Sequence, residues 1–151
     1  MVSPLAFVSD EENATLSHTY TRLIVHTIFS TKDRIAYLSE DRRSEVFRYM
    51  GGILRKLDCQ PLHINGVADH THMIIGIAPS WPVAEIIQKV KSNSTRWIHE
   101  NDVLQRSFAW QRGYAAFSVS RSNLDAVYPS MWPIKRNIID DGHFRRNYVH
   151  F

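Results

Sequence analysis

The stretch Tyr20-Thr-Arg-Leu-Ile-Val-His-Thr-Ile-Phe29 sets the fold that we expect for this chain of 151 residues. The stretch is rich in β-branched and aromatic side chains, which favour strands. Leu23, Val25, Thr27 and Phe29 occupy alternate positions, so they lie on one face of a period-2 strand. We therefore predict a first strand here, at the centre of a sheet.

Two helices are predicted from apolar side chains that recur at spacings of three and four residues. The first helix begins at Ser39, because a serine hydroxyl is a typical N-cap group. Its apolar positions are Val46, Tyr49, Met50, Ile53 and Leu57. The apolar stripe of the second helix consists of Val83, Ile86, Ile87, Val90, Ser94, Trp97 and Ile98.

Three further strands complete the pattern. One contains Leu62, Ile64 and Val67, and the next spans Met73 to Ile77, with a connection around residues 68–70. A weaker alternation predicts a fourth strand over residues 109–119. The order strand, helix, strand, strand, helix, strand is typical of an α+β ferredoxin-like sandwich, with two helices on one face of an antiparallel sheet.

The ends of the chain differ from this central part. Residues 1–16 have no periodic apolar face and are expected to form a loose leader, with the domain proper over residues 17–128. A third helix is expected from Asn123, capped by Ser120 or Ser122, and Pro129 and Pro133 are expected to interrupt it. Residues 129–151 are thus predicted to be an atypical tail, helical or irregular.

Composition restricts the class of protein. With 44% hydrophobic and 22% charged residues, the chain resembles ordinary globular proteins. The single cysteine, Cys59, cannot form an intramolecular disulfide, which fits a reducing compartment. No apolar run approaches the roughly 20 residues of a membrane helix, so we expect a cytoplasmic protein without a membrane partner. The net charge of +3 permits a polyanionic ligand.

Asp69-His70-Thr71-His72 is the strongest candidate for chemistry. On a strand, positions i and i+2 face the same side, so His70 and His72 can share one divalent ion. Two imidazoles are half of a metal site, and they suit Mn and Zn better than Mg. The alternative is a pair of hydrogen-bonded surface histidines. His18, His26, His63 and His99 lie on separate elements and are interpreted as structural or solvated side chains.

Basic and hydroxyl side chains form a second candidate group. Lys32 and Arg34 follow the first strand, and the second helix carries Lys89, Lys91, Ser92, Asn93 and Arg96 on its polar face. Cations beside hydroxyls and an aromatic ring are what phosphate contacts and base stacking require. The alternative is an ordinary solvated helix face. Tyr114 is interpreted as a sheet-packing residue.

These pieces together resemble the single-tyrosine HUH transposases of the insertion-sequence 200/605 type, including the REP-associated branch. The stretches that carry the resemblance are residues 26–34, 65–75, 91–98 and 110–120, in the order of that family. The resemblance implies a homodimer that binds DNA hairpins and cuts and rejoins single-stranded DNA through a 5′-phosphotyrosine. It also implies a divalent metal, Mg or Mn, on His70 and His72.

The resemblance fails at the nucleophile. The slot of the family's tyrosine falls on Ser130, and that of a glutamine metal ligand falls on Ile134. Tyr128 is a substitute two positions earlier, roughly 200° away around a helix. Reading residues 130–146 from the third base of each codon, with free choice of wobble bases, gives Y-V-A-N-Q-E-E-H-H-R-R-R-T-F-Q-E. This frame restores both residues, so we hypothesise a frameshift close to Pro129.

Two alternatives to the active transposase remain open. If the residues from Pro129 onward are those that the cell makes, the chain is a catalytically inactive DNA-hairpin-binding protein of the same fold. The other alternative is an unrelated small metal-binding enzyme or ferredoxin-like sensor that uses His70 and His72 for different work.

Overall fold

The computed structural model describes residues 21–130. The strands are β1 (Leu23–Ser30), β2 (Gln60–Gly66), β3 (His70–Ile77) and β4 (Ala115–Ser118). The helices are α1 (Arg43–Lys56), α2 (Val83–Glu100) and α3 (Leu124–Ser130). The predicted leader, residues 1–16, and the tail beyond residue 130 lie outside the described residues. Within 21–130, no helix is both long and apolar enough to cross a bilayer.

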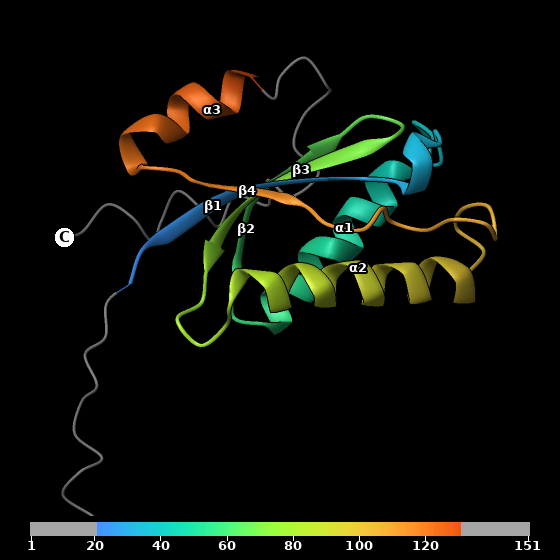
Figure 1. Cartoon of the computed structure of the whole chain (residues 1–151), viewed down its shortest axis with the longest axis horizontal. Coiled ribbons are helices and arrows are strands. Elements are labelled where there is room, and N and C mark those ends of the chain that lie inside the picture. The colour runs from blue at the N-terminus through green and yellow to red at the C-terminus, as the bar shows by residue number, and fades with distance from the viewer. Residues whose placement is uncertain (1–20, 131–151) are drawn as a thin grey trace, which may run out of the picture.

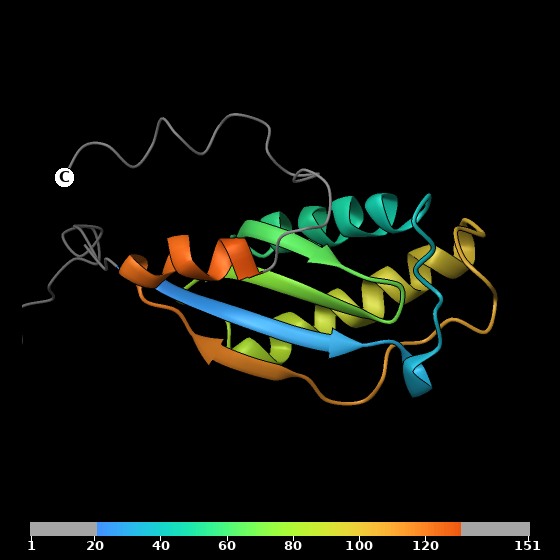
Figure 2. The ribbon, with the colours of Figure 1, turned by 90° about the horizontal axis from the view of Figure 1, so that it is seen from above.

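The four strands form one antiparallel sheet in the order β2-β3-β1-β4. The central position predicted for the first strand is confirmed, since β1 lies between β3 and β4. Helices α1 and α2 cover one face of the sheet, and α3 lies on the other (Figures 1 and 2). The predicted α+β sandwich with two helices on one face is therefore confirmed.

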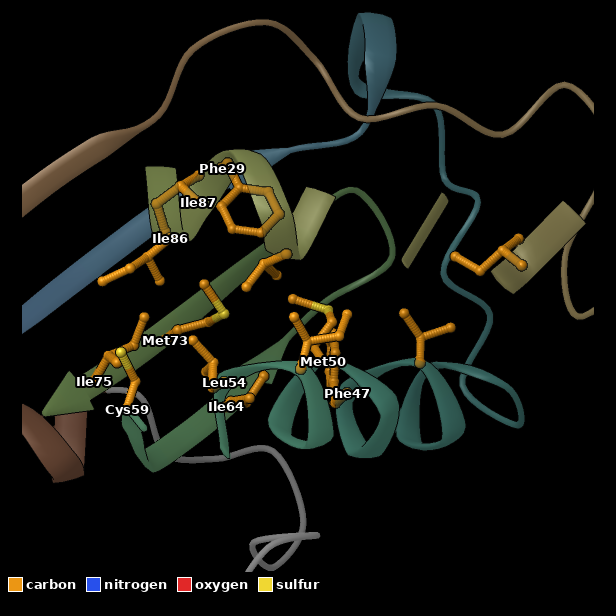
Figure 3. Close-up of a cluster of buried hydrophobic side chains, with 14 of the residues drawn as sticks. Phe29, Phe47, Met50, Leu54, Cys59, Ile64, Met73, Ile75, Ile86 and Ile87 are labelled. Atoms are coloured by element: carbon orange, nitrogen blue, oxygen red, sulfur yellow. The ribbon is translucent and has the colours of Figure 1, made fainter. Parts of the chain in front are cut away.

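The core lies between the sheet and the two long helices (Figure 3). Phe47, Met50 and Leu54 of α1 are fully buried, as are Met73 of β3 and Ile86 of α2. Burying such a side chain contributes about 1.5–3 kcal/mol relative to exposure. This layer fixes which face of each strand is turned toward the helices, and hence which residues are left for the other face.

Several sequence predictions about element ends are wrong. Strand β2 ends before Val67, and β3 begins at His70 instead of Met73. Helix α1 begins at Arg43 instead of Ser39, because the carbonyl of Ser39 accepts hydrogen bonds from the amides of Arg42 and Arg43 in a preceding turn. The fourth strand is limited to β4, since residues 109–114 form a loop in which Gly113 has a φ of +77°. Such a φ favours glycine and breaks the strand.

The third helix also differs from its prediction. A short 3-10 turn at Arg121–Asn123 precedes α3, and the hydroxyls of Ser120 and Ser122 bond to each other rather than to a helix amide. Pro129 does not interrupt α3 within the described residues, which extend to Ser130.

Helix α3 covers only one end of the second face of the sheet. Its side chains Leu124 and Val127 pack on Ile24 of β1 and Ile74 of β3, with Leu62 and Val119 beside them. The end at which β1 finishes and β3 begins is not part of this cluster. That end carries the histidines.

Candidate functional site

Strand β3 places His70 and His72 on the second face of the sheet, as their spacing predicts. Their ring centroids lie 5.1 Å apart. Residue Thr71 between them is fully buried and donates its hydroxyl hydrogen to the carbonyl of Asn65 on β2. The inward Thr71 therefore fixes the outward direction of both histidines, because side chains alternate along a strand.

His70 is held by a carboxylate that is itself held by an arginine. Asp69 Oδ1 lies 2.7 Å from His70 Nδ1, and Arg34 Nε donates to Asp69 Oδ2 at 2.9 Å. The hydrogen bond with His70, and then the Arg34 guanidinium, hold the pKa of the Asp69 carboxyl below its usual value. An ionised carboxylate only accepts, so Nδ1 of His70 carries a proton, and in the neutral form of the ring Nε2 has the lone pair.

A tight turn brings Arg34 to this position. Asp33 and Arg34 have φ values of 54° and 58°, an uncommon region for residues other than glycine. The backbone amide of Asp33 donates to the side-chain oxygen of Gln111, which ties the turn to the loop before β4.

His72 is held by a second histidine. Nε2 of His26, on β1, lies 3.0 Å from Nδ1 of His72, and the two rings are stacked with centroids 5.3 Å apart. Burial, reinforced by the neighbouring imidazoles, lowers the pKa of His72 to about 4. Burial also lowers the pKa of His26. Both rings are therefore neutral near pH 7, the form in which imidazole binds metals.

A cavity of about 320 Å³ opens beside the histidine pair, and its lining includes Arg34, Arg112 and Tyr114. A groove of about 460 Å³ lies between α2 and the loop of residues 109–114. Arg112, Gly113 and Tyr114 line both hollows, so this loop forms the wall between them. Tyr114, predicted to pack in the sheet, is instead 41% exposed.

The structure separates the predicted DNA-binding residues into two groups. Lys32 is exposed directly after β1, at the end of the sheet that carries the histidines, and Arg34 contacts Asp69 there. Helix α2 covers the other face of the sheet (Figure 2). The α2 residues Lys89, Ser92, Asn93 and Arg96 are therefore not brought together with His70 and His72.

The side chains of α2 make local contacts. Arg96 bonds to Asn93, Asn93 bonds to the carbonyl of Lys89, and the ammonium of Lys89 lies over Trp81. Ser92 is exposed and lines the groove beside the loop.

Lys91, predicted to bind DNA, contacts the protein itself, so the alternative of a solvated helix face does not hold for it. Its ammonium lies 4.9 Å from the centre of the Phe29 ring and donates to the carbonyls of Gln111 and Gly113. Burial lowers its pKa. Lys91 thus stabilises the loop that separates the two hollows, and its ammonium group interacts mainly with other groups of the protein.

Tyr128 and Ser130 belong to the last turn of α3, on the same face of the sheet as the histidine pair. The structure describes side chains of this helix only as far as Val127. The role of Tyr128 as a substitute nucleophile, and the place of Ser130 in the slot of the family's tyrosine, therefore stay predictions. Ile134 lies outside the described residues.

The histidine pair fits half of a metal site. Each Nδ1 has a partner within the protein, so the ring nitrogen that each can offer to an ion is Nε2. Within residues 21–130, no cluster of three or more His, Cys, Asp or Glu side chains has metal-binding geometry. Further ligands of an ion here would come from water, from a phosphate or from residues beyond this range.

Sequence reasoning missed two residues of this site, His26 and Arg112. The alternation of the first strand, which put Val25 and Thr27 toward the core, already placed His26 on the face of His70 and His72. The signal in the sequence was weaker for Arg112. The residue was predicted to be in a strand, whereas the structure places it in the loop between the two hollows.

Comparisons with known proteins agree with the fold. The chain is 30% identical over 126 residues to the transposases for insertion sequence element IS200 of Salmonella typhimurium and Salmonella typhi, covering 76% of this chain and 78% of each relative. Among solved structures, a protein of Deinococcus radiodurans assigned as a transposase has a TM-score of 0.61 at 15% identity, over 77% of this chain and 93% of that chain.

A REP-associated tyrosine transposase bound to a REP hairpin has a TM-score of 0.55 at 11% identity, over 77% of this chain and 71% of that one. At these identities the two structures establish the fold alone. The model of the IS200-like transposase family matches residues 19–128, which include the four strands, the histidine pair and most of α3. The chain therefore belongs to the IS200-like transposase family.

Proposed function

We propose that this chain binds hairpin or single-stranded DNA with a backbone phosphate at the histidine pair. The observation that carries the proposal is that Asp69 and His26 hold the Nδ1 atoms of His70 and His72. This arrangement leaves Nε2 of each ring as the nitrogen that can be offered to an ion, beside a cavity whose lining includes Arg34 and Arg112. Arginines at such a cavity favour a phosphate, which is positioned mainly by cationic side chains.

A divalent ion, Mg or Mn, belongs to this proposal. Held by His70 and His72, it would act as a Lewis acid on the scissile phosphate. The protein's own residues fix the two imidazoles, through Asp69 and His26, and neutralise phosphate charge, through Arg34 and Arg112.

The DNA path that the surface favours runs from the histidine pair over the loop at residues 112–114 to the groove beside α2. Tyr114 offers an exposed ring on which a base can stack. Ser92 lines the groove and Arg96 is exposed on α2, while Lys32 is exposed near the start of the path. The charge of Lys91 is already used by the loop, so its contribution is to hold that loop in place.

For strand cleavage we propose Tyr128 as the nucleophile. Its phenolic oxygen would lose a proton and attack the phosphorus, forming a 5′-phosphotyrosine while the bond to the 3′-oxygen breaks and releases a 3′-hydroxyl. The specific competitor is a catalytically inactive hairpin-binding protein, favoured by Ser130 and Ile134 in the slots of the family's tyrosine and glutamine. Membership of the transposase family argues against an unrelated metal-binding sensor.

A covalent-adduct assay separates the two functions. Hairpin DNA with a single-stranded flank is labelled on the side that would stay on the protein and incubated with Mn²⁺ and the purified chain. A labelled band that survives denaturing gel electrophoresis, and that Tyr128→Phe abolishes, supports the transposase. Salt-sensitive hairpin binding without such a band supports the inactive binder. If the hairpin DNA shows no binding above that in a protein-free control, both functions are overturned.

The proposal extends to domain limits, assembly and location. We assign DNA binding to residues 17–128, regard residues 129–151 as an atypical tail, and propose a cytoplasmic homodimer. Support for the location is the lone Cys59, which is buried in the core. Light scattering of the purified chain, with and without hairpin DNA, tests the dimer.

A further inference from the structure

We propose that His26 is a positioning residue for His72, accepting a hydrogen bond from Nδ1 of His72 and so leaving Nε2 of that ring unprotonated. The inference rests on the proposed function, in which His72 is a metal ligand. It assigns a role to a side chain that would otherwise be counted as an ordinary histidine of the sheet.

The contact is built into the centre of the sheet. In the antiparallel register, His26 pairs with Ile74 and Ile28 pairs with His72, so His26 and His72 are diagonal neighbours on one face. Such neighbours are within reach of aromatic side chains. Their nitrogens lie 3.0 Å apart and their rings are inclined by only 25°. Both backbones are held on two sides by other strands.

On its other side, His26 contacts an aromatic residue of β4. Phe117 is its register partner, and the two ring centroids lie 6.4 Å apart. The His26 ring thus lies between Phe117 and His72, which restricts its rotation. A ring held in this way can keep one nitrogen directed at His72.

The hydrogen bond can be made in two ways, and only one of them serves a metal. If His26 donated, His72 would carry its proton on Nε2 and would have no lone pair there. If His72 donates, Nε2 is a free ligand, as it is in His70, where the Asp69 carboxylate accepts. The hydrogen-bond partner of one ring nitrogen therefore determines whether the other nitrogen of the same neutral ring is protonated.

The use of histidine, rather than a second carboxylate, has a chemical reason. Asp69 already places one negative charge beside the pair. Like charges repel, so another carboxylate at position 26 would oppose the approach of a phosphate. A neutral imidazole accepts the hydrogen bond without adding charge.

Two variants of position 26 separate hydrogen bonding from packing. His26→Gln keeps an acceptor, whereas His26→Phe keeps a ring of similar size and removes the acceptor. The protonated nitrogen of His72 is read from ¹⁵N–¹H spectra of the metal-free, full-length chain. His99 is an internal reference for the opposite state, since its Nε2 lies 2.9 Å from the carbonyl oxygen of Phe108 and must donate.

We expect the proton of His72 on Nδ1 in the wild type and in His26→Gln, and its loss from that position in His26→Phe. The Kd for Mn²⁺ should rise about 10–100-fold in His26→Phe and much less in His26→Gln. A wild-type His72 protonated on Nε2 overturns the inference, as does a His26→Phe variant with the wild-type spectrum and Kd.

Failure of the proposed function has a different signature. A wild type that has the Nδ1 proton on His72 but no Mn²⁺ binding would count against the metal site and leave the positioning role standing. His70→Ala is the matched control, because it should abolish Mn²⁺ binding without moving the proton of His72.

Discussion

Asp69 binds His70 with one carboxylate oxygen, Oδ1, and Arg34 with the other. The carboxylate therefore connects the turn after β1 to the first residue of β3. Removing it would release the His70 ring and leave Arg34 without this partner.

Asp69→Ala should weaken Mn²⁺ binding about 10–100-fold, the usual effect of losing the outer partner of a metal-binding histidine. Isothermal titration with Mn²⁺ measures it. Arg34→Ala should have a smaller effect, because the carboxylate remains. Equal Kd values for Asp69→Ala and the wild type would show that the carboxylate has no part in metal binding.

Replacing both His70 and His72 by Ala should abolish metal-dependent cleavage and leave hairpin affinity largely unchanged. The reason is that phosphate contacts by cationic side chains supply most of the affinity. Cleavage is followed by gel electrophoresis and affinity by fluorescence anisotropy. A large loss of affinity in a double variant with the wild-type circular dichroism spectrum would contradict this division of roles.

Lys32→Ala and Arg112→Ala should each reduce DNA affinity and flatten its salt dependence. Removing one cation that binds a phosphate of single-stranded DNA should lower the slope of log K against log salt by about 0.7. Lys56→Ala is the matched control, since Lys56 is exposed at the end of α1, in the helix layer on the other face of the sheet. An identical loss of affinity in the control would remove Lys32 and Arg112 from the interface.

The metal-free protein should lose stability as the pH falls from about 6.5 toward 4. Burial and the neighbouring imidazoles lower the pKa of His72 from 6.5 to about 4 in the folded state, so the unfolded chain takes up the proton first. The contribution of His72 to the free energy of unfolding is fully present above pH 6.5 and declines below it. Urea unfolding in the presence of a chelator measures the change, and His72→Gln should have a shallower pH dependence than the wild type.

Gly66→Ala should destabilise the hairpin of β2 and β3. A Cβ at this position would lie 2.3 Å from the carbonyl oxygen of His70 and 2.9 Å from Cα of Thr71, and both are backbone atoms that cannot rotate away. Gly52→Ala is the control, because its Cβ would meet nothing within 4 Å. A melting temperature unchanged in both variants would contradict this account.

Much of the fold was predictable because its signals are local. The alternation in residues 20–29 identified β1, and the three-and-four spacing identified α1 and α2. The start of α1 was not predictable from Ser39, since a serine serves equally well in the turn that precedes the helix. The extent of β4 was missed because Gly113 and its loop interrupt the alternation.

The site was predictable only in part. The spacing of His70 and His72 is a local signal, and the structure places both on one face. The contact of His26 with His72 joins residues 46 positions apart in sequence, and it depends on the register of β1 and β3. Similarly, Lys91 was predicted to bind DNA, and its hydrogen bonds with the loop at residues 111–113 depend on a contact between distant parts of the sequence.

The place of β3 between β2 and β1 has a consequence for how the molecule opens. Amide hydrogens of an inner strand exchange with solvent only when most of the sheet comes apart, whereas a short helix attached by a few apolar side chains can detach alone. The strand that bears the histidine pair is thus in the most protected part of the domain, and α3, which bears Tyr128, rests chiefly on Ile24 and Ile74. Hydrogen exchange should be slow for the amides of β3, which carries the histidine pair, and fast for those of α3, which carries the proposed nucleophile.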